Sequence, residues 1–541
     1  MKRTWHKHYA PGVPPAIPFE KTILPEMLSD AVRDFPDKEA IIFYDSPIRF
    51  FELEKLVNRT ANALLDLGIK RGDKIALLLP NMPQIVIAAF AAWKTGAVVV
   101  MTNLLNTDRE LEHQLSDSGS EVLVALDLLC PRMIALKEKT HIRTIIVVHA
   151  RDHILNPTGR ELHLDIEPAE GIHQWKDLID TYPDTAPGVR IDLEDLACLQ
   201  YTGGTTGISK AAVLTHTNLS WNVQQTRAWF HSIVRGRGAL LAVLPYFHSF
   251  GMLAGMNISI LLAQTQVLIP QPDLDTILNS IQKYKITLFP GVPTLYTAIL
   301  SHPKISEYDL STLEVCISGG APLPVDLIDS FERLTSVRIC EAYGLTEAGP
   351  LVSVNPFGGK TKHGSVGVPI PDTDVRIVNV DSAVSLCAPG EEGEITVKGP
   401  QIMQGYYRMP KETAQTLKNG WLHTGDIGRM DEEGYLYIVD RKKDMIIAGG
   451  YNIYPNEIDQ VLFEHPKILE ACTIGVPDPY RGETVKSFIV VNPGEELSED
   501  EVIDYCREKL AKYKVPRMIE LTGSLPKSGP GKILRKELKR I

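Results

Sequence analysis

The stretch from Tyr201 to Lys210, YTGGTTGISK, contains the residue types that proteins use to hold a phosphate group. Its glycines let bare backbone N–H groups face an anion, its threonines add hydroxyl donors, and Lys210 adds a point charge. The spacing differs from that of a Walker A loop, where Gly and Lys are adjacent, and from the G-x-G-x-x-G dinucleotide fingerprint. The chemistry predicts a phosphate loop, and the alternative is a plain polar turn between a strand and a helix.

Two stretches downstream carry carboxylates near glycines and hydroxyl groups. Glu341–Glu347 (EAYGLTE) offers an aromatic ring suited to a base and a carboxylate suited to Mg²⁺ beside phosphate. Asn419–Asp426 (NGWLHTGD) ends in an aspartate that could accept hydrogen bonds from both hydroxyls of a ribose. Taken singly, the first stretch is better explained as a strand-end turn with a solvated Glu347, and the alternative for the second is an aspartate that caps a turn after Gly425.

Three more stretches carry cations or paired glycines near the C-terminus. Ile438–Asp444 concentrates charge, which by itself indicates a solvated face. Gly449 and Gly450 would allow close approach of a thin ligand, although a plain turn before a helix explains them as well. Lys532 lies in a Gly/Pro-rich segment, where a lysine is usually only exposed.

Alternating helix and strand patterns predict the scaffold that positions these stretches. The pattern predicts strands at 74–79, 97–101, 121–126 and 144–149 and helices at 50–67, 83–94 and 108–115, with Asn81 as the cap of the second helix. Ile191–Tyr201 is a strand or its approach, a helix begins after Thr215 or Thr217, and residues 151–190 are an irregular surface excursion. Such an order predicts parallel sheets with helices on both faces.

Composition limits the kind of protein. A chain of 541 residues needs two or more domains, and its net charge of −11 argues against general nucleic-acid binding. Seven scattered cysteines without a C-x-x-C pair predict a reduced, cytosolic protein, and the basic N-terminus lacks the apolar run of a signal peptide. Residues 238–272 have no Asp, Glu, Lys or Arg, but their prolines and amides favour buried strand, loop, helix and strand over a membrane span.

Together, in this order and spacing, the motifs resemble those of the acyl-adenylate-forming enzymes, which include acyl-CoA synthetases, firefly luciferase and peptide-synthetase adenylation domains. The sequences NGWLHTGDIG, VDRKKDMI and NIYPNEI resemble most closely the bacterial long-chain fatty acid–CoA ligases. Ser209 and Ala211 stand where that family commonly has Pro and Gly, which predicts a change in loop stiffness with Lys210 kept in place.

The resemblance implies a role for particular residues. It implies catalytic roles for Lys532, Thr202, His248 and Glu347, with Thr206 and Glu347 as metal ligands. It implies that ATP or AMP is bound by Thr202, Gly203, Gly204, Thr205, Thr206, Gly207, Lys210, Gly320, Ala321, Pro322, Glu341, Ala342, Tyr343, Gly344, Thr346, Asp426, Ile438, Arg441 and Lys532. It further implies that Gly449, Gly450 and Tyr451 line the CoA channel and that Asp440 and Lys443 form a hinge.

The resemblance also implies an architecture and a reaction. The expected fold is α/β: residues 1–439 form a large N-terminal domain of parallel-type sheets with flanking helices and a β-rich subdomain. Residues 440–443 are the hinge, and residues 444–541 form a small mobile α+β C-terminal domain. The expected reaction joins a carboxylic acid to AMP from ATP, with Mg²⁺, releases pyrophosphate, and then transfers the acyl group to CoA.

Several alternatives are open at this point. The acid is expected to be a medium- or long-chain fatty acid, with aromatic, alicyclic or short-chain acids, loading of a carrier protein, an oxygenase of the luciferase kind and the ATP-forming direction as alternatives. A fatty-acid-binding or uptake protein with vestigial catalysis is the alternative from another class. The expected partners are small molecules and not nucleic acid, in the cytoplasm; peripheral attachment to the inner face of the membrane and a homodimer are both open.

Overall fold

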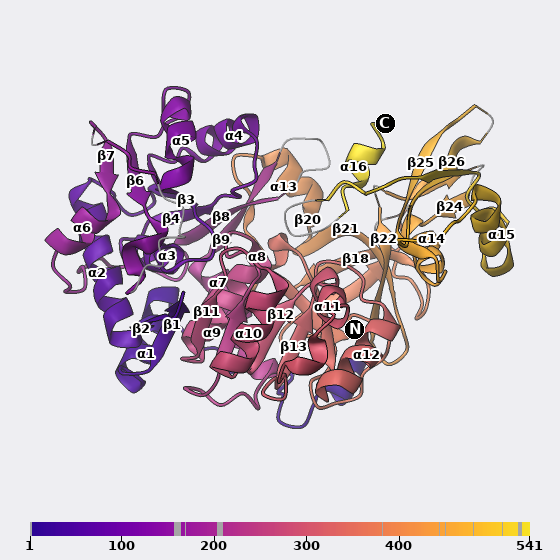
Figure 1. Cartoon of the computed structure of the whole chain (residues 1–541), viewed down its shortest axis with the longest axis horizontal. Helices are drawn as coiled ribbons and strands as arrows, with labels where there is room; N and C mark the ends of the chain where they lie inside the picture. The colour runs from indigo at the N-terminus through magenta and orange to yellow at the C-terminus, as the bar shows by residue number, and fades with distance from the viewer. Residues whose placement is uncertain are drawn as a thin grey trace. The chain divides into compact units, whose positions relative to one another are not determined.

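The protein is described from a computed structural model (Figure 1). The structure describes residues 3–155, 164–167, 169–202, 209–380, 382, 384–442, 444–448, 451–479, 481–510, 512–527 and 533–540, with only the backbone of Tyr451, Asn452 and Gly482. The chain divides into two compact units, residues 1–374 with 397–422, and residues 375–396 with 423–541. The predicted boundary at 440–443 stays a prediction.

An eight-stranded sheet in the first unit carries the start of the predicted phosphate loop. Its order is β19-β9-β8-β4-β3-β5-β6-β7, and β3 to β8 run parallel whereas β8, β9 and β19 are antiparallel. The strands are β3 (Lys74–Leu78), β4 (Val98–Met101), β5 (Val122–Leu126), β6 (Thr144–Val148), β7 (Ile172–Gln174), β8 (Leu196–Thr202), β9 (Lys210–Thr215) and β19 (Gly405–Tyr406). The helices of this region are α2 (Phe50–Asp66), α3 (Pro83–Lys94), α4 (Asp108–Ser118), α5 (Cys130–Lys137) and α6 (Trp175–Thr181).

A nine-stranded sheet in the same unit carries the other nucleotide motif. Its order is β16-β15-β14-β13-β12-β10-β11-β1-β2, again parallel in the middle and antiparallel at both edges. The strands are β1 (Glu39–Phe43), β2 (Ser46–Arg49), β10 (Ala239–Ala242), β11 (Thr265–Leu268), β12 (Leu288–Gly291), β13 (Val315–Ser318), β14 (Ile339–Gly344), β15 (Leu351–Val354) and β16 (Val368–Pro369). The helices are α1 (Leu24–Asp34), α7 (His216–Trp229), α8 (Ser249–Gly251), the π-helix η4 (Met252–Asn257), α9 (Ile258–Leu261), α10 (Leu274–Tyr284), α11 (Pro293–Leu300) and α12 (Val325–Thr335).

Helix α3 shows why the layers hold together. Every residue of Pro83–Lys94 is buried, and the helix contacts β3 and β4 of one sheet as well as α2, which contacts β1 of the other. The sequence predicted Asn81 as the cap of this helix, and that prediction is wrong. Asn81 Nδ2 donates instead to the carbonyls of Ala242 and Leu244, both at 2.8 Å. The N-cap is Met82, and Asn81 instead ties the start of α3 to the end of β10.

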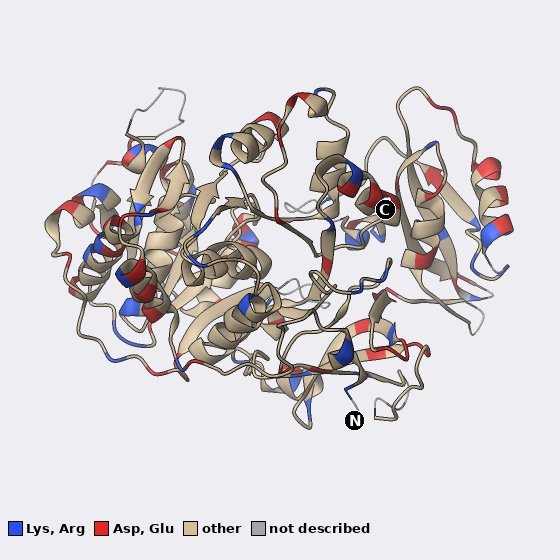
Figure 2. Ribbon diagram, turned by 90° about the horizontal axis from the view of Figure 1, so that it is seen from below, with Lys and Arg blue, Asp and Glu red and all other residues tan. Residues whose placement is uncertain are grey.

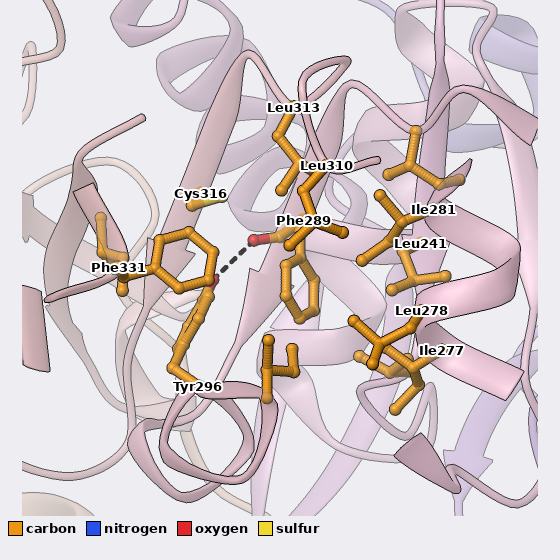
Figure 3. Packing of buried hydrophobic residues seen from close by; sticks show 14 of the residues in the cluster. Leu241, Ile277, Leu278, Ile281, Phe289, Tyr296, Leu310, Leu313, Cys316 and Phe331 are labelled. Atoms are coloured by element: carbon orange, nitrogen blue, oxygen red, sulfur yellow. Dashed lines mark hydrogen bonds between the residues drawn. The ribbon is translucent and has the colours of Figure 1, made fainter. Parts of the chain in front are cut away.

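The core of the nine-stranded sheet fixes the strands that lead to the site (Figure 3). Apolar side chains from β10, α10, β12, α11, β13 and α12 pack there, among them Leu241, Ile281 and Phe331. Tyr296 is fully buried, and its hydroxyl donates to the carbonyls of Phe289 at 2.8 Å and Ile317 at 3.0 Å. A buried tyrosine with a satisfied hydroxyl joins β12 to β13 without cost to the core.

The second unit is built around an antiparallel sheet of its own. The C-terminal sheet has the order β24-β23-β26-β25, with β27 parallel to β26, and β22 pairs with β21. The elements that lie in or enter this unit are β17 (Asp374–Val378), β18 (Gly393–Lys398), β21 (Trp421–Met430), β22 (Leu436–Arg441), β23 (Ile446–Ala448), β24 (Tyr451–Ile453), α14 (Pro455–Phe463), β25 (Ile468–Asp478), β26 (Gly482–Val491), α15 (Glu499–Lys509), β27 (Met518–Leu521) and α16 (Arg535–Leu538). The first unit also holds α13 (Pro410–Thr416) and β20 (Leu417–Lys418).

The fold corrects one sequence prediction, adds one strand that the sequence did not predict, and confirms the helix expected after Thr215 or Thr217. Residues 172–181 are not irregular, because β7 joins the parallel sheet beside β6 and α6 follows it. Between the predicted phosphate loop and α7 the chain forms β9, which reverses along β8 before the helix begins at His216.

Charged residues and apolar segments occupy different parts of the fold. Basic and acidic residues are interspersed along the outer helices, while the sheet strands are mostly uncharged (Figure 2). Residues 238–272 form β10, α8, η4, α9 and β11, so the predicted strand, loop, helix and strand are confirmed. Within the described part of the chain, none of the helices combines the length and apolarity needed to cross a membrane. Six of the seven cysteines are buried thiols.

Candidate active site

The two ends of the predicted phosphate loop are held opposite each other by strand pairing. Thr202 at the end of β8 pairs with Lys210 at the start of β9, and the Thr202 hydroxyl donates to the Lys210 carbonyl at 3.4 Å. The loop residues Gly203, Gly204, Thr205, Thr206 and Gly207 lie outside the described residues. The described ends therefore show how the scaffold closes this loop.

Tyr406 connects the lysine of this loop to the predicted magnesium ligand. The Lys210 ammonium lies over the Tyr406 ring, 5.3 Å from its centroid, and the Tyr406 hydroxyl donates to Glu347 Oε1 at 2.8 Å. Burial raises the pKa of the Tyr406 hydroxyl, so this group stays a donor at neutral pH. Two motifs that are far apart in the sequence thus meet at one aromatic side chain.

Strand pairing and a backbone bond fix the position of Tyr406. It pairs with Ala212 of β9, and Met403 N donates to the Glu347 carbonyl at 2.9 Å. The sequence analysis missed Tyr406. A Gly-Tyr-Tyr run at 405–407, between the Glu341–Glu347 and Asn419–Asp426 stretches, was the available signal, but only the pairing of β19 with β9 gives it meaning.

His248 and Thr346 lie on neighbouring segments at the same edge of the sheets. His248 is exposed and its Nδ1 accepts a hydrogen bond from Phe250 N at 3.3 Å, so it is not the buried core histidine that a lone His among aromatics suggests. Ser249 Oγ and Thr346 Oγ1 share a hydrogen bond of 3.0 Å. Gln200 of β8 donates to the Phe247 carbonyl at 2.8 Å, so β8 positions this segment too.

The end of β14 carries the second nucleotide motif and positions a neighbouring turn. Glu341 is buried, and its Oε1 accepts from Leu323 N at 3.2 Å, which ties β14 to the turn of Gly320, Ala321 and Pro322. Desolvation raises the pKa of Glu341 to about 8, so the carboxyl is protonated at neutral pH. Ala342 and Tyr343 are buried on the same strand.

Gly344 is required by close backbone approach. A Cβ at Gly344 would lie 2.2 Å from the carbonyl oxygen of Pro350, a distance that no side chain can adopt. Glycine at this place lets β14 turn toward Thr346 and Glu347, which are half-buried. The predicted residues from Glu341 to Glu347 therefore surround one strand end, which is where open α/β sheets bind ligands.

In the second unit, the predicted ribose ligands face each other across two strands. Asp426 of β21 pairs with Arg441 of β22, and Arg441 Nε lies 3.4 Å from Asp426 Oδ1. Ile438 is half-buried on the same strand as Arg441. Asp440 points the other way and is buried, and it accepts hydrogen bonds from the backbone N–H groups of Arg441 and Asn456, each at 2.7 Å.

Several predicted residues cannot be placed. Lys443, Gly449, Gly450 and Lys532 lie outside the described residues, as does the side chain of Tyr451. Among the described residues, no three His, Cys, Asp or Glu side chains group as metal ligands. Glu347, an oxygen ligand oriented by Tyr406, fits one position of a Mg²⁺ site completed by water and phosphate.

Comparison with known proteins agrees with this arrangement. The AMP-binding enzyme family matches residues 28–407, and the AMP-binding enzyme C-terminal domain matches residues 457–532. A long-chain-fatty-acid–CoA ligase of Bacillus subtilis is 42% identical, covering 99% of this chain and 98% of the relative.

Solved structures that are similar to this chain include an acid–CoA ligase and another protein of the same fold. ATP-bound MatB from Rhodopseudomonas palustris has a TM-score of 0.86 at 29% identity, covering 96% of this chain and 99% of that one. The anthranilate CoA ligase AuaEII in complex with anthranoyl-AMP has a TM-score of 0.86 at 28% identity, covering 97% and 98%. The chain belongs to the AMP-binding enzyme family, and the predicted family and α/β fold class are confirmed.

Proposed function

We propose that the protein is an ATP-dependent carboxylic acid–CoA ligase that acts on medium- or long-chain fatty acids. The observation that carries this proposal is the meeting of Lys210 and Glu347 at Tyr406, because it joins a phosphate-loop cation to a carboxylate suited to Mg²⁺. The name of the Bacillus subtilis relative, which is similar over nearly its whole length, supports the choice of reaction and substrate.

The proposed reaction has two steps. In the first, a carboxylate oxygen of the acid attacks the α-phosphorus of ATP, and the bond to pyrophosphate breaks. In the second, the thiol of CoA attacks the acyl carbonyl of the acyl-AMP, and AMP leaves. The mixed anhydride makes a poor electrophile reactive, so no protein nucleophile is needed, which agrees with buried cysteines whose thiol pKa values are raised by desolvation.

Each proposed role belongs to a particular residue, and of these residues Lys532 lies outside the described part of the chain. Thr202 and Lys210 hold phosphate oxygens, and the turn of Gly320, Ala321 and Pro322, with Ala342 and Tyr343, forms the base pocket behind Gly344. Asp426 and Arg441 hold the ribose beside Ile438. Lys532 neutralises charge that develops on the carboxylate and α-phosphate oxygens. His248 lies beside the acyl and thiol channel, a proposal that the hydrogen bond between its neighbour Ser249 and Thr346 supports.

A magnesium ion would be held by Glu347 and by Thr206 of the phosphate loop. When bound, such an ion neutralises phosphate charge as pyrophosphate leaves. The chain's own contribution is to orient the Glu347 carboxylate through Tyr406 and to keep Lys210 facing the same region.

The two proposed steps require different protein groups beside the acyl-AMP. We propose that the C-terminal domain, residues 444–541, turns about Asp440–Lys443 between the steps, replacing Lys532 with the face of Gly449, Gly450 and Tyr451 that lines the CoA channel. Such a rigid-body turn about a short linker is a common switching device.

A ring acid is the second candidate substrate. The similarity to an anthranilate CoA ligase supports it, because that protein binds an aromatic acyl-AMP on the same fold. We propose a cytoplasmic enzyme whose partners are acid, ATP and CoA. Attachment to the inner face of the membrane and a homodimer are additional proposals.

The deciding experiment is CoA-dependent AMP release with ATP, Mg²⁺ and a ladder of acids from acetate to palmitate, with benzoate and cyclohexanecarboxylate. We expect a maximum at medium or long chains. A maximum at ring or short acids would keep the reaction and overturn the substrate. No AMP with any acid would contradict the ligase and favour a fatty-acid-binding protein.

A further inference from the structure

Arg535 of the second unit is a largely buried cation held by side chains from two other elements. Its Nη2 donates to Asp459 Oδ2 of α14 at 2.6 Å and also to Asn456 Oδ1, while its Nη1 lies 3.6 Å from Asp440 Oδ1 of β22. The side chains of Arg535, Asp459 and Asp440 are 18%, 10% and 0% exposed. Because water has little access, the positive charge of Arg535 and the negative charges of Asp440 and Asp459 must neutralise one another.

Asp440 is bound to α14 as well as to Arg535. Its Oδ2 accepts from Asn456 N at 2.7 Å, in the first turn of α14, where backbone N–H groups have no partner within the helix. Its Oδ1 accepts from Arg441 N at 2.7 Å. The carboxylate thus joins β22, the start of α14 and the guanidinium of Arg535.

The described residues that flank positions 528–532 pair with each other. Lys527 and Ile533 form an antiparallel bridge, and Leu534 N donates to the Pro526 carbonyl at 2.8 Å. Leu525 and Leu538 pack into a core cluster with Ile474 and Phe488 of β25 and β26. Arg535 follows Lys532 by three residues.

Stability alone does not account for this cluster. Desolvation of buried charges opposes their attraction, so well-packed apolar residues often stabilise a protein as much as a buried ion-pair network does. A planar guanidinium that binds two acceptors, by contrast, fixes direction as well as distance. The cluster includes Asp440, at the predicted hinge, and Arg535, which follows Lys532 by three residues.

We propose that Arg535 is a positioning residue for Lys532, and that its contact with Asp440 fixes the Lys532 segment in the orientation used for forming the acyl-AMP. This inference rests on the proposed function. The second step, in which CoA takes the acyl group, does not use Lys532, so it does not require the contact. The cluster therefore acts on one half of the reaction.

The test uses the full-length chain with Arg535→Lys and Arg535→Gln, each assayed for two half-reactions. The first is decanoate-dependent exchange of pyrophosphate into ATP, and the second is decanoyl-CoA formation from supplied decanoyl-AMP. Misplacing a reacting group by about 1 Å costs roughly 100-fold, so we expect exchange to fall by about that factor and the second half-reaction to change less than about 3-fold. Arg540→Gln is the matched control, because Arg540 lies in the same segment and its Nη1 lies 3.0 Å from Glu537 Oε1 across one helical turn, with its side chain 62% exposed.

A second variant and a second measurement separate positioning from folding. Asp440→Asn keeps an acceptor for Asn456 N but removes the charge facing Arg535, so it should show the same split with a smaller loss. Hydrogen exchange of the amides in residues 524–527 and 533–538 should rise in Arg535→Gln and stay unchanged in Arg540→Gln. If Arg535→Gln does not fold, the two half-reactions of Arg535→Lys and Asp440→Asn decide whether Arg535 has the positioning role.

Each result has a defined meaning. Equal loss of both half-reactions, or no loss in either, would overturn the positioning role while leaving the proposed function intact, provided that Lys532→Ala still abolishes exchange. Absence of exchange in the unaltered protein with every acid would overturn the proposed function and this inference with it.

Discussion

Two clusters that combine carboxylates with cations, one in each unit, are built in opposite ways. In the first unit, the Tyr406 ring lies against Lys210 and its hydroxyl binds Glu347, and all three side chains are half-buried. In the second unit, Arg535 contacts Asp440 and Asp459 directly, in a largely buried setting. A tyrosine placed between opposite charges keeps both available to a ligand, whereas direct pairing commits the charges to holding the fold.

Replacing Lys532, the lysine that the Arg535 cluster is proposed to position, should have the largest effect on activity. Lys532→Ala should lower acid-dependent ATP–pyrophosphate exchange by roughly 100- to 1,000-fold, as for loss of one transition-state donor. Acyl-CoA formation from supplied acyl-AMP should be spared. Lys536→Ala is the control, because Lys536 is exposed in the same segment. Equal loss of both half-reactions would show that Lys532 does not divide the steps as proposed.

Stiffening the predicted hinge should affect the opposite step. Lys443→Pro restricts the backbone of the linker, so formation of acyl-CoA from acyl-AMP should fall by about 10-fold or more while exchange is largely retained. Both half-reactions are measured on the same preparation. An unimpaired second step would place the pivot elsewhere in the chain.

Removing the Tyr406 hydroxyl tests the half-buried cluster of the first unit. Tyr406→Phe keeps the ring over Lys210 but deletes the donor to Glu347, and a hydrogen bond to a charged group contributes about 1.5–3 kcal/mol. We expect exchange to fall by about 10-fold, with a higher Mg²⁺ concentration needed for half-maximal rate. Tyr407→Phe is the neighbouring control. An unchanged Mg²⁺ dependence would mean that Tyr406 does not orient the carboxylate.

The last prediction concerns stability instead of activity, at a buried carboxyl that belongs to neither cluster. The folded pKa of Glu341 is raised from 4.5 to about 8, so the folded state binds more protons than the unfolded state between these values. Stability from this group is therefore full below pH 4.5 and is lost as pH rises toward 8, by up to about 1.4 kcal/mol per pH unit. Glu341→Gln should unfold like the unaltered protein at pH 5 and be more stable at pH 9. Parallel melting curves at both pH values would contradict the raised pKa.

Much of the scaffold could be predicted because its signals are local. Pro83–Lys94 is predicted and observed as a helix with the same bounds, since an apolar run with Pro at its start admits few other structures. The strands at 74–79, 97–101, 121–126 and 144–149 are likewise observed within one or two residues.

What could not be predicted depends on contacts between distant segments. Nothing near Tyr406 in the sequence indicates that β19 pairs with β9, and β9 itself follows a glycine-rich stretch that favours a turn. Asn81 looks like a helix cap, but two distant carbonyls bind its amide more favourably. Asp440 and Arg535 are separated by 95 positions, so their pairing is visible only in the fold.

The pairing of Thr202 with Lys210 has a consequence for how this part of the chain can change in evolution. Side chains on a strand alternate between two faces, so a shift of one residue in β9 would turn Lys210 away from Tyr406 and reverse every other side chain of the strand. The number of residues between positions 202 and 210 is not restricted in this way, because the pairing of Thr202 with Lys210 fixes the register of β9 on β8. Insertions there should be tolerated by the sheet, whereas a single deletion within β9 should not.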